Sequence, residues 1–172
     1  TNLTMLDAFF NLEYKGNTWF DGLEISNHPE FDRYRNAFPV INLNLKNTKA
    51  ETFESYVADL KDALNATFDR FRYLMKSDLV YDDEKETFDK VIWGTIPTEN
   101  ISRCIPLLCR MLERHHGVKP IILIDEYDRA VSDAFGSDSH RPMMNLLGGF
   151  MCEALKNNDS LQMAYVTGIM QI

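Results

Sequence analysis

The chain has 172 residues, of which 45% are hydrophobic and 12% aromatic, and its formal net charge at pH 7 is -8. This length and composition are those of one globular domain, and no apolar run approaches the roughly 20 residues that a membrane-spanning helix needs. The acidic balance argues against general binding to nucleic acid, which depends on clustered lysine and arginine side chains. A membrane partner is therefore excluded by the sequence, and a nucleic-acid partner is disfavoured for this segment.

The cysteines indicate the compartment. Cys104, Cys109 and Cys152 are odd in number and lack the C-x-x-C spacing of zinc and redox sites. They are typical of reduced, buried cysteines in a cytosolic protein. No basic segment followed by an apolar one opens the chain, so no signal peptide is expected. We predict a cytoplasmic protein.

The first half of the chain contains two predicted helices and one predicted strand. Apolar residues at helical spacing predict a helix over residues 1–10, and residues 17–36 are expected to form loops with at most one helical turn. Residues 38–45 predict a strand, in which Pro39 is tolerated because it lies among the first residues. The longest helix is predicted over residues 51–75, with one apolar face and one acidic face.

The second half continues the alternation of helices and strands. Helices are predicted over residues 82–94 and 97–117, each ended by a glycine, and strands over 121–124 and 161–167. Pro142 opens a further helix through residue 157 that contains Gly148 and Gly149. Each glycine inside a helix costs about 1 kcal/mol relative to alanine, so we expect a close packing contact or a break there.

This alternation predicts an α/β fold with a parallel sheet covered by helices. Residues 121–124 are four apolar residues in a row, as expected for a strand that is buried on both faces. We expect this strand to lie between the other two, or next to both ends of the site, with all three parallel.

Two acids, Asp125 and Glu126, directly follow the buried strand. Ligands bind at this edge of open α/β sheets, and two adjacent carboxylates there need a cation or strong donors nearby. Mg²⁺ bound to a nucleotide phosphate would supply the cation. The pattern is that of the Walker B motif of P-loop NTPases, in which the first acid serves the metal and the second activates water. The alternative is a buried strand that ends in a solvated acidic turn, as in many α/β proteins.

Thr167 and Gly168 end the next strand. In many NTPases the strand beside the acidic one places a polar side chain near the γ-phosphate, and Thr167 has the right chemistry for that role. The alternative is a strand-end threonine before a turn glycine.

Five blocks occur together and in order in this chain: residues 2–6 (NLTML), 19–25 (WFDGLEI), 38–43 (FPVINL), 121–128 (IILIDEYD) and 166–168 (VTG). With these blocks the chain resembles the predicted AAA-ATPase-like family, a group of P-loop proteins, many of them fused to a C-terminal PD-(D/E)XK nuclease-like domain. The resemblance spans the whole chain, and the Ile-Asp-Glu-Tyr-Asp block is its most specific part.

The resemblance implies a P-loop NTPase core of the AAA/ASCE-like type that hydrolyses ATP with Mg²⁺. Asp125 would hold Mg²⁺ through water, Glu126 would be the general base, and Thr167 would sense the γ-phosphate. The implied partner is a nucleotide. Nucleic acid would enter only through a nuclease-like domain, and a homo-oligomer is compatible with the assignment.

The sequence departs from the family pattern at both ends. The family's Walker A motif, R-x-x-F-G-K-[ST], precedes the block at residues 2–6, and this sequence contains no Gly-rich phosphate loop and no P-loop lysine. Thr1 is then either the residue after the loop or the loop's own hydroxyl, in both cases at the nucleotide. After Gly168 the relatives often have Ser-Arg where this chain has Ile-Met, so no arginine role is carried over. We expect residues 1–172 to be a single incomplete domain, truncated at both ends.

Two other functions use the same acids. A nucleotide-gated switch or interaction module would bind nucleotide without significant turnover. The string at residues 125–128 also fits the D-E-x-D box of helicases, although the acidic charge and the lack of a Ser-Ala-Thr motif after the next strand argue against it. For the ATPase, Asp125, Glu126 and Thr167 should surround one polar depression, bordered by the start of the first helix.

Overall fold

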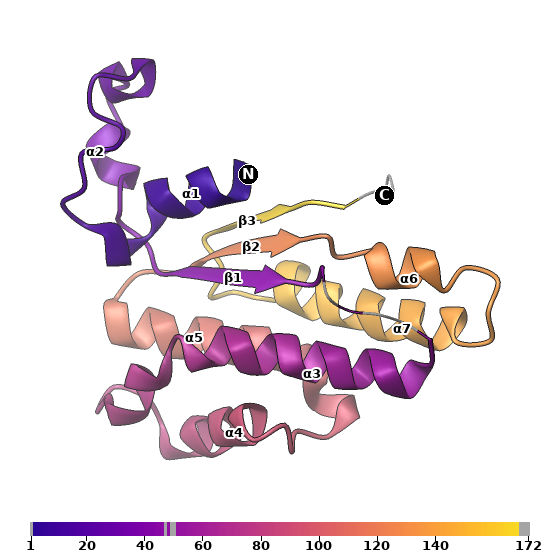
Figure 1. The fold of residues 1–172 in the computed structure, drawn as a ribbon. Coiled ribbons are helices and arrows are strands. Elements are labelled where there is room, and N and C mark those ends of the chain that lie inside the picture. Colours follow the sequence, from indigo (N-terminus) through magenta and orange to yellow (C-terminus); the bar gives the residue numbers. More distant parts are fainter. Residues whose placement is uncertain (1, 47, 49–50, 169–172) are drawn as a thin grey trace.

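The computed structural model describes residues 2–46, 48 and 51–168. At its centre is a three-stranded sheet that consists of β1 (Val40–Asn44), β2 (Ile121–Asp125) and β3 (Met163–Val166). Both strand pairs are parallel and the order is β1-β2-β3, so the strand with the acids lies in the middle (Figure 1). The predicted α/β class, the parallel sheet and the central position of the acidic strand are confirmed.

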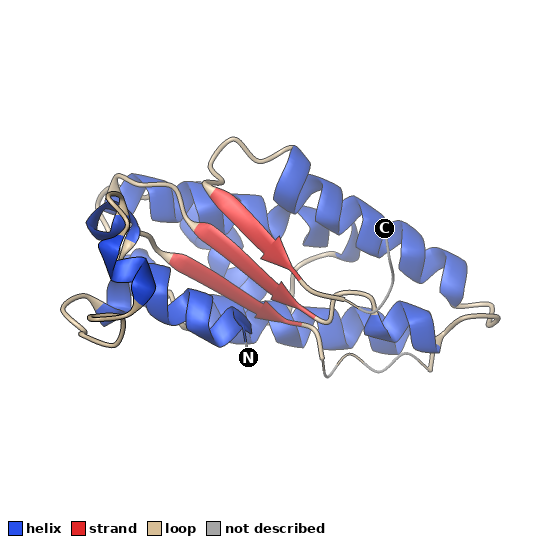
Figure 2. Ribbon diagram, turned by 90° about the horizontal axis from the view of Figure 1, so that it is seen from above, coloured by secondary structure: helices blue, strands red, loops and turns tan. Residues whose placement is uncertain are grey.

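Helices cover both faces of this sheet (Figures 1 and 2). One face carries the amino-terminal helices, α1 (Asn2–Phe10) and α2 (Phe31–Tyr34). The other face carries the remaining long helices, with α4 packed outside α3 and α5: α3 (Phe53–Asp69), α4 (Asp82–Ile92), α5 (Cys104–His116) and α7 (His140–Met151). The short helix α6 (Arg129–Asp133) follows β2.

The alternation of side chains along each strand explains why β2 is apolar throughout. Ile122 and Ile124 belong to the large core with α3, α5 and α7, whereas Ile121 and Leu123 belong to a second cluster beneath α1. All four side chains are at most 1% exposed. Successive residues of a strand point to opposite faces, so a strand covered on both sides has no polar position until it leaves the sheet. The first such position on β2 is Asp125.

Two predicted helices are shorter than expected. The helix predicted over residues 51–75 ends at Asp69, because the buried Phe71 leaves helical geometry (φ -110°, ψ 19°) before a 3₁₀ segment at Arg72–Lys76. The stretch after Pro97 begins as a 3₁₀ segment, Thr98–Arg103, and becomes α-helical only at Cys104. Within the described part of the chain, no helix combines the length and the apolar character that crossing a membrane requires.

The expectation for Gly148 and Gly149 was wrong. A Cβ atom on either residue would meet nothing within 4 Å, and α7 runs through both to Met151 before a π-helical turn at Cys152–Lys156. Both glycines are exposed, so neither a close neighbour nor a break at the pair accounts for them.

The cysteine prediction holds for two of the three residues. Cys104 and Cys109 are buried free thiols, and burial raises the pKa of each to about 12. Cys152 is a free thiol too, but it is exposed at the end of α7.

A small polar network fixes α1 above the sheet. Asn36 has a left-handed backbone (φ 50°), and its side-chain amide donates to the carbonyl oxygens of Ala8, Phe9 and Asn11 at 3.0–3.2 Å. These carbonyls lie at the end of a helix, where the helix itself supplies no donors. Because this end is held beside the start of β1, the first turn of α1 lies toward the carboxyl ends of the strands (Figure 1).

Candidate functional site

Polar side chains gather on the α1 face of the sheet where the strands end. Asn42 and Asn44 on β1 align with Leu123 and Asp125 on β2, and Thr167 directly follows β3. The side-chain period of two places these residues on one face with Leu123, which packs beneath α1. Neither asparagine was predicted as a site residue from the sequence. Their alternation in Val-Ile-Asn-Leu-Asn is the signal that could have revealed them.

Asp125 and Thr167 contact each other directly. The Thr167 hydroxyl donates to Asp125 Oδ1 at 2.5 Å, while the Thr167 amide donates to the Ile124 carbonyl at 2.9 Å. The Tyr127 amide in turn donates to the Thr167 carbonyl at 3.3 Å, so the β2–β3 pairing extends past the ends of both strands. This hydrogen bond engages one oxygen of Asp125, and among the residues that the structure describes Oδ2 is the oxygen left for a further donor or a metal ion.

A cavity of about 390 Å³ lies beside Asp125, between the start of α1 and the carboxyl ends of β1 and β2. Its polar lining consists of Thr4, Asp7, Asn42, Asn44, Lys46 and Asp125. Helix α1 therefore borders the acidic strand end as predicted, but of the three residues expected to surround this depression only Asp125 lines it, and Glu126 and Thr167 do not. The lining combines carboxylates, amide groups, a hydroxyl and one ammonium group, which suits a ligand that carries both anionic groups and a bound cation.

Glu126 lies apart from this cavity lining. Its Oε2 accepts a hydrogen bond from Arg129 Nη1 at 3.0 Å, an ion pair to the first residue of α6. Its backbone is left-handed (φ 52°), a conformation that costs a residue with a side chain about 1–2 kcal/mol. Such strain is often found at functional sites. The structure thus brings Asp125 and Thr167 together and turns Glu126 toward α6.

Gly168 packs closely against the residues after Glu126. A Cβ atom there would lie 2.4 Å from Tyr127 Cε1 and 2.8 Å from Asp128 Oδ1. Asp128 is fully buried, and Tyr127 packs against the large core. Burial raises the pKa of Tyr127, and the charge of Asp128 raises it further. Tyr127 is therefore a packing residue that covers the turn after β3.

The donor set fits Mg²⁺ bound together with a nucleotide. In the portion that the structure describes, no cluster of three or more His, Cys, Asp or Glu side chains could hold a metal ion. Mg²⁺ usually keeps several waters and binds through one or two carboxylates plus substrate phosphates, so Asp125 is the residue at this sheet edge that could hold it together with a nucleotide. Thr1, the other predicted nucleotide contact, lies outside the described residues.

The fold and the site together define an α/β protein with its polar site at the carboxyl edge of a parallel sheet, where such proteins bind ligands. Residues 1–172 match the family described as predicted AAA-ATPase, and the chain belongs to that family. The family implies nucleotide binding and, in general terms, an ATPase. A search of curated proteins and a search of solved structures found no match.

Proposed function

We propose that residues 1–172 form part of a P-loop NTPase core that hydrolyses ATP with Mg²⁺. The observation that carries the proposal is the hydrogen bond between Thr167 and Asp125, beside a cavity that the start of α1 borders. This juxtaposition supports an acidic metal-holding residue and a neighbouring polar sensor at one sheet edge.

Each residue has a distinct role in the proposal. Asp125 holds Mg²⁺ through water, with Thr167 fixing the orientation of its carboxylate. Thr167 also senses the γ-phosphate, and Lys46 and Asn44 offer donors to bound anionic groups. Bound MgATP supplies the scissile phosphoanhydride bond and the positive charge that the carboxylates require.

Glu126 accepts the proton of the attacking water in this proposal. To do so its carboxylate has to leave Arg129. The pair is partly exposed, with side-chain exposures of 45% for Arg129 and 30% for Glu126, so it contributes at most about 1 kcal/mol and opposes the movement only weakly.

The complete site needs a phosphate-binding loop, which the sequence of residues 1–172 does not contain. The backbone amides and lysine of such a loop provide most of the binding energy for a triphosphate. The 172-residue chain alone is therefore expected to bind MgATP weakly or not at all in a calorimetric titration. Micromolar affinity would contradict the expectation that triphosphate binding in this family fold depends on such a loop.

The metal-holding role is tested in the full-length protein by Asp125→Asn. Loss of the carboxylate is expected to raise the Mg²⁺ concentration needed for half-maximal ATP hydrolysis by about 10–100-fold, the usual effect of removing an outer-sphere metal partner. The measurement is phosphate release against Mg²⁺ concentration. Asp138→Asn, which neutralises an exposed acid in the turn before α7, is the matched control and should leave the curve unchanged. An unshifted curve for Asp125→Asn would refute the assignment.

One observation favours the nucleotide-gated switch as a second candidate. Glu126 pairs with Arg129 and does not line the cavity beside Asp125, an arrangement that suits a protein that binds nucleotide without rapid turnover. Tight nucleotide binding with no hydrolysis in a single-turnover experiment would support the switch. The D-E-x-D helicase alternative has no comparable observation in its favour.

A further inference from the structure

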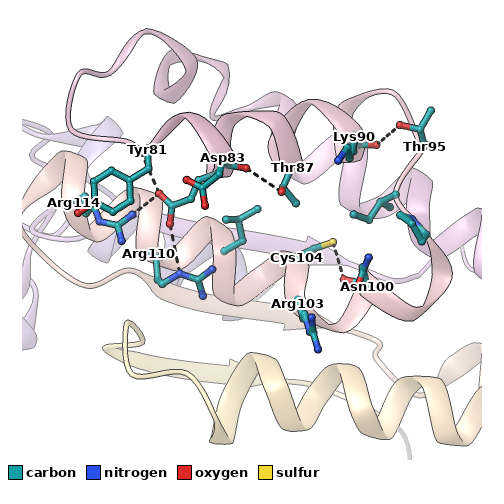
Figure 3. A pocket seen from close by; sticks show the side chains of 14 residues that line it. Tyr81, Asp83, Thr87, Lys90, Thr95, Asn100, Arg103, Cys104, Arg110 and Arg114 are labelled. Carbon is teal, nitrogen blue, oxygen red and sulfur yellow. Dashed lines mark hydrogen bonds and ion pairs between the residues drawn. The ribbon is translucent and has the colours of Figure 1, made fainter.

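A second and larger cavity, of about 730 Å³, lies between α4 and the Thr98–His116 segment formed by the 3₁₀ turn and α5 (Figure 3). All its lining residues fall within residues 81–114, and none of them lines the cavity beside Asp125. Its volume is within the range of about 300–1,000 Å³ that is typical of small-molecule sites. It is therefore a separate cavity of a size that can hold a small organic ligand.

The charge of this cavity differs in sign from that of the whole chain. Its lining contains four cationic and two acidic side chains, although the chain has a net charge of -8: Lys90, Arg103, Arg110 and Arg114 against Asp83 and Glu84. A local excess of positive charge in a concave surface raises the local concentration of anions.

At one end of the cavity, the positive charges are already paired with an acidic side chain of the protein. Glu84 has a side chain that is only 7% exposed, and its Oε2 accepts a hydrogen bond from Arg114. Arg110 Nε lies 3.6 Å from Glu84 Oε1, and the Arg114 guanidinium lies 4.0 Å from the centre of the Tyr81 ring. The buried acid thus occupies the two arginines at this end and fixes their positions.

The other end has cations without an acidic partner. Lys90 projects from α4 and Arg103 from the 3₁₀ turn that precedes α5, and neither forms an ion pair among the residues that the structure describes. Thr95 and Asn100 add a hydroxyl and an amide group to the same end. The two cations come from different elements that line one cavity, so a bound anionic group can accept charge-assisted hydrogen bonds from either of them.

An apolar floor lies beside this end of the cavity. Ile96 and Leu107 are 3% and 5% exposed and both line the cavity. The buried Cys104 thiol also lines it and is uncharged at neutral pH, because burial raises its pKa to about 12. The cavity therefore offers apolar contact next to unpaired positive charge.

We propose that this cavity binds a small organic anion that carries a phosphate or carboxylate group on an apolar or aromatic body. Lys90 and Arg103 hold the anionic group, and the body lies over Ile96 and Leu107. The proposal is independent of the ATPase assignment, since no residue at the carboxyl edge of the sheet takes part.

The test is a calorimetric titration of the full-length protein with phenyl phosphate and with phenylacetate. We expect saturable binding of at least one, and the tighter of the two identifies the preferred anionic group. Inorganic phosphate and benzyl alcohol should each bind more weakly, because the first lacks the apolar body and the second lacks the charge. Arg103→Gln and Lys90→Gln should each weaken binding of the aromatic anion about tenfold or more, as expected for the loss of a charge-assisted hydrogen bond.

Lys156→Gln is the matched control, because it removes an exposed cation at the far end of the π-helical turn. It should leave the affinity unchanged, and thermal unfolding of each variant verifies that the fold is retained. The proposal is overturned if neither aromatic anion saturates, if the double variant of Lys90 and Arg103 binds like the parent, or if Lys156→Gln weakens binding as much as the cavity variants do. Equal affinity for inorganic and phenyl phosphate would likewise refute the role of the apolar floor.

Discussion

Replacing Glu126 by Gln in the full-length protein is expected to lower ATP turnover by about 10²–10⁴-fold, the range that loss of a general base produces. The amide has nearly the size and hydrogen-bonding reach of the carboxylate but cannot accept the proton of water. Nucleotide affinity should be retained or increased, since the substitution leaves Asp125 and Thr167 in place. Single-turnover phosphate release, together with a separate measurement of nucleotide binding, distinguishes the two effects.

The ion pair of Glu126 provides the matched control. Arg129→Gln removes the same contact to α6 but keeps the carboxylate, so it should hydrolyse ATP at the parental rate or faster. If Arg129→Gln slows hydrolysis as strongly as Glu126→Gln does, the ion pair itself supports turnover, and Glu126 does not act as the general base. If Glu126→Gln hydrolyses ATP at the parental rate, Glu126 is not the general base. That result would favour the nucleotide-gated switch or the helicase as the function.

Replacing Gly168 by Ala is expected to lower the free energy of unfolding by about 1–3 kcal/mol, as overpacking of a filled site usually does. The added methyl group would lie 2.4 Å from Tyr127 Cε1 and 2.8 Å from Asp128 Oδ1, and the buried Asp128 cannot easily move. Relief of the clash would displace Tyr127 or the turn that holds Thr167 against Asp125, so the rate of ATP hydrolysis should fall as well. Denaturant unfolding and phosphate release measure the two effects.

Gly149→Ala adds the same methyl group where it meets nothing within 4 Å. Alanine is favoured over glycine in a helix by about 1 kcal/mol, so this control should raise the free energy of unfolding. The two substitutions are expected to have opposite signs. If Gly168→Ala is as stable as the parent while Gly149→Ala is stabilised, Tyr127 can move aside and the close approach at Gly168 is not a constraint.

The sequence by itself determined the elements of the sheet and the position of the acids. A strand such as β2 is buried on both faces, so its residues have to be apolar along its whole length. The first acidic residue can therefore appear only where the strand leaves the sheet. The long intervals between strands required crossovers and therefore a parallel sheet. Family membership was likewise recognisable from the block around Asp125 and its companions.

Apart from the closeness of Asp125 and Thr167, which the sequence predicted, only the tertiary structure decided which polar side chains meet. The direction of Glu126 depends on a left-handed backbone and on Arg129, and no periodicity in the sequence specifies either. The pairing register between β1 and β2 put Asn44 beside Asp125. The packing of α4 on α5 brought Lys90 and Arg103 into the lining of one cavity. The physical reason is that sequence periodicity fixes the buried face of each element, whereas the contacts between polar side chains depend on how separate elements pack together.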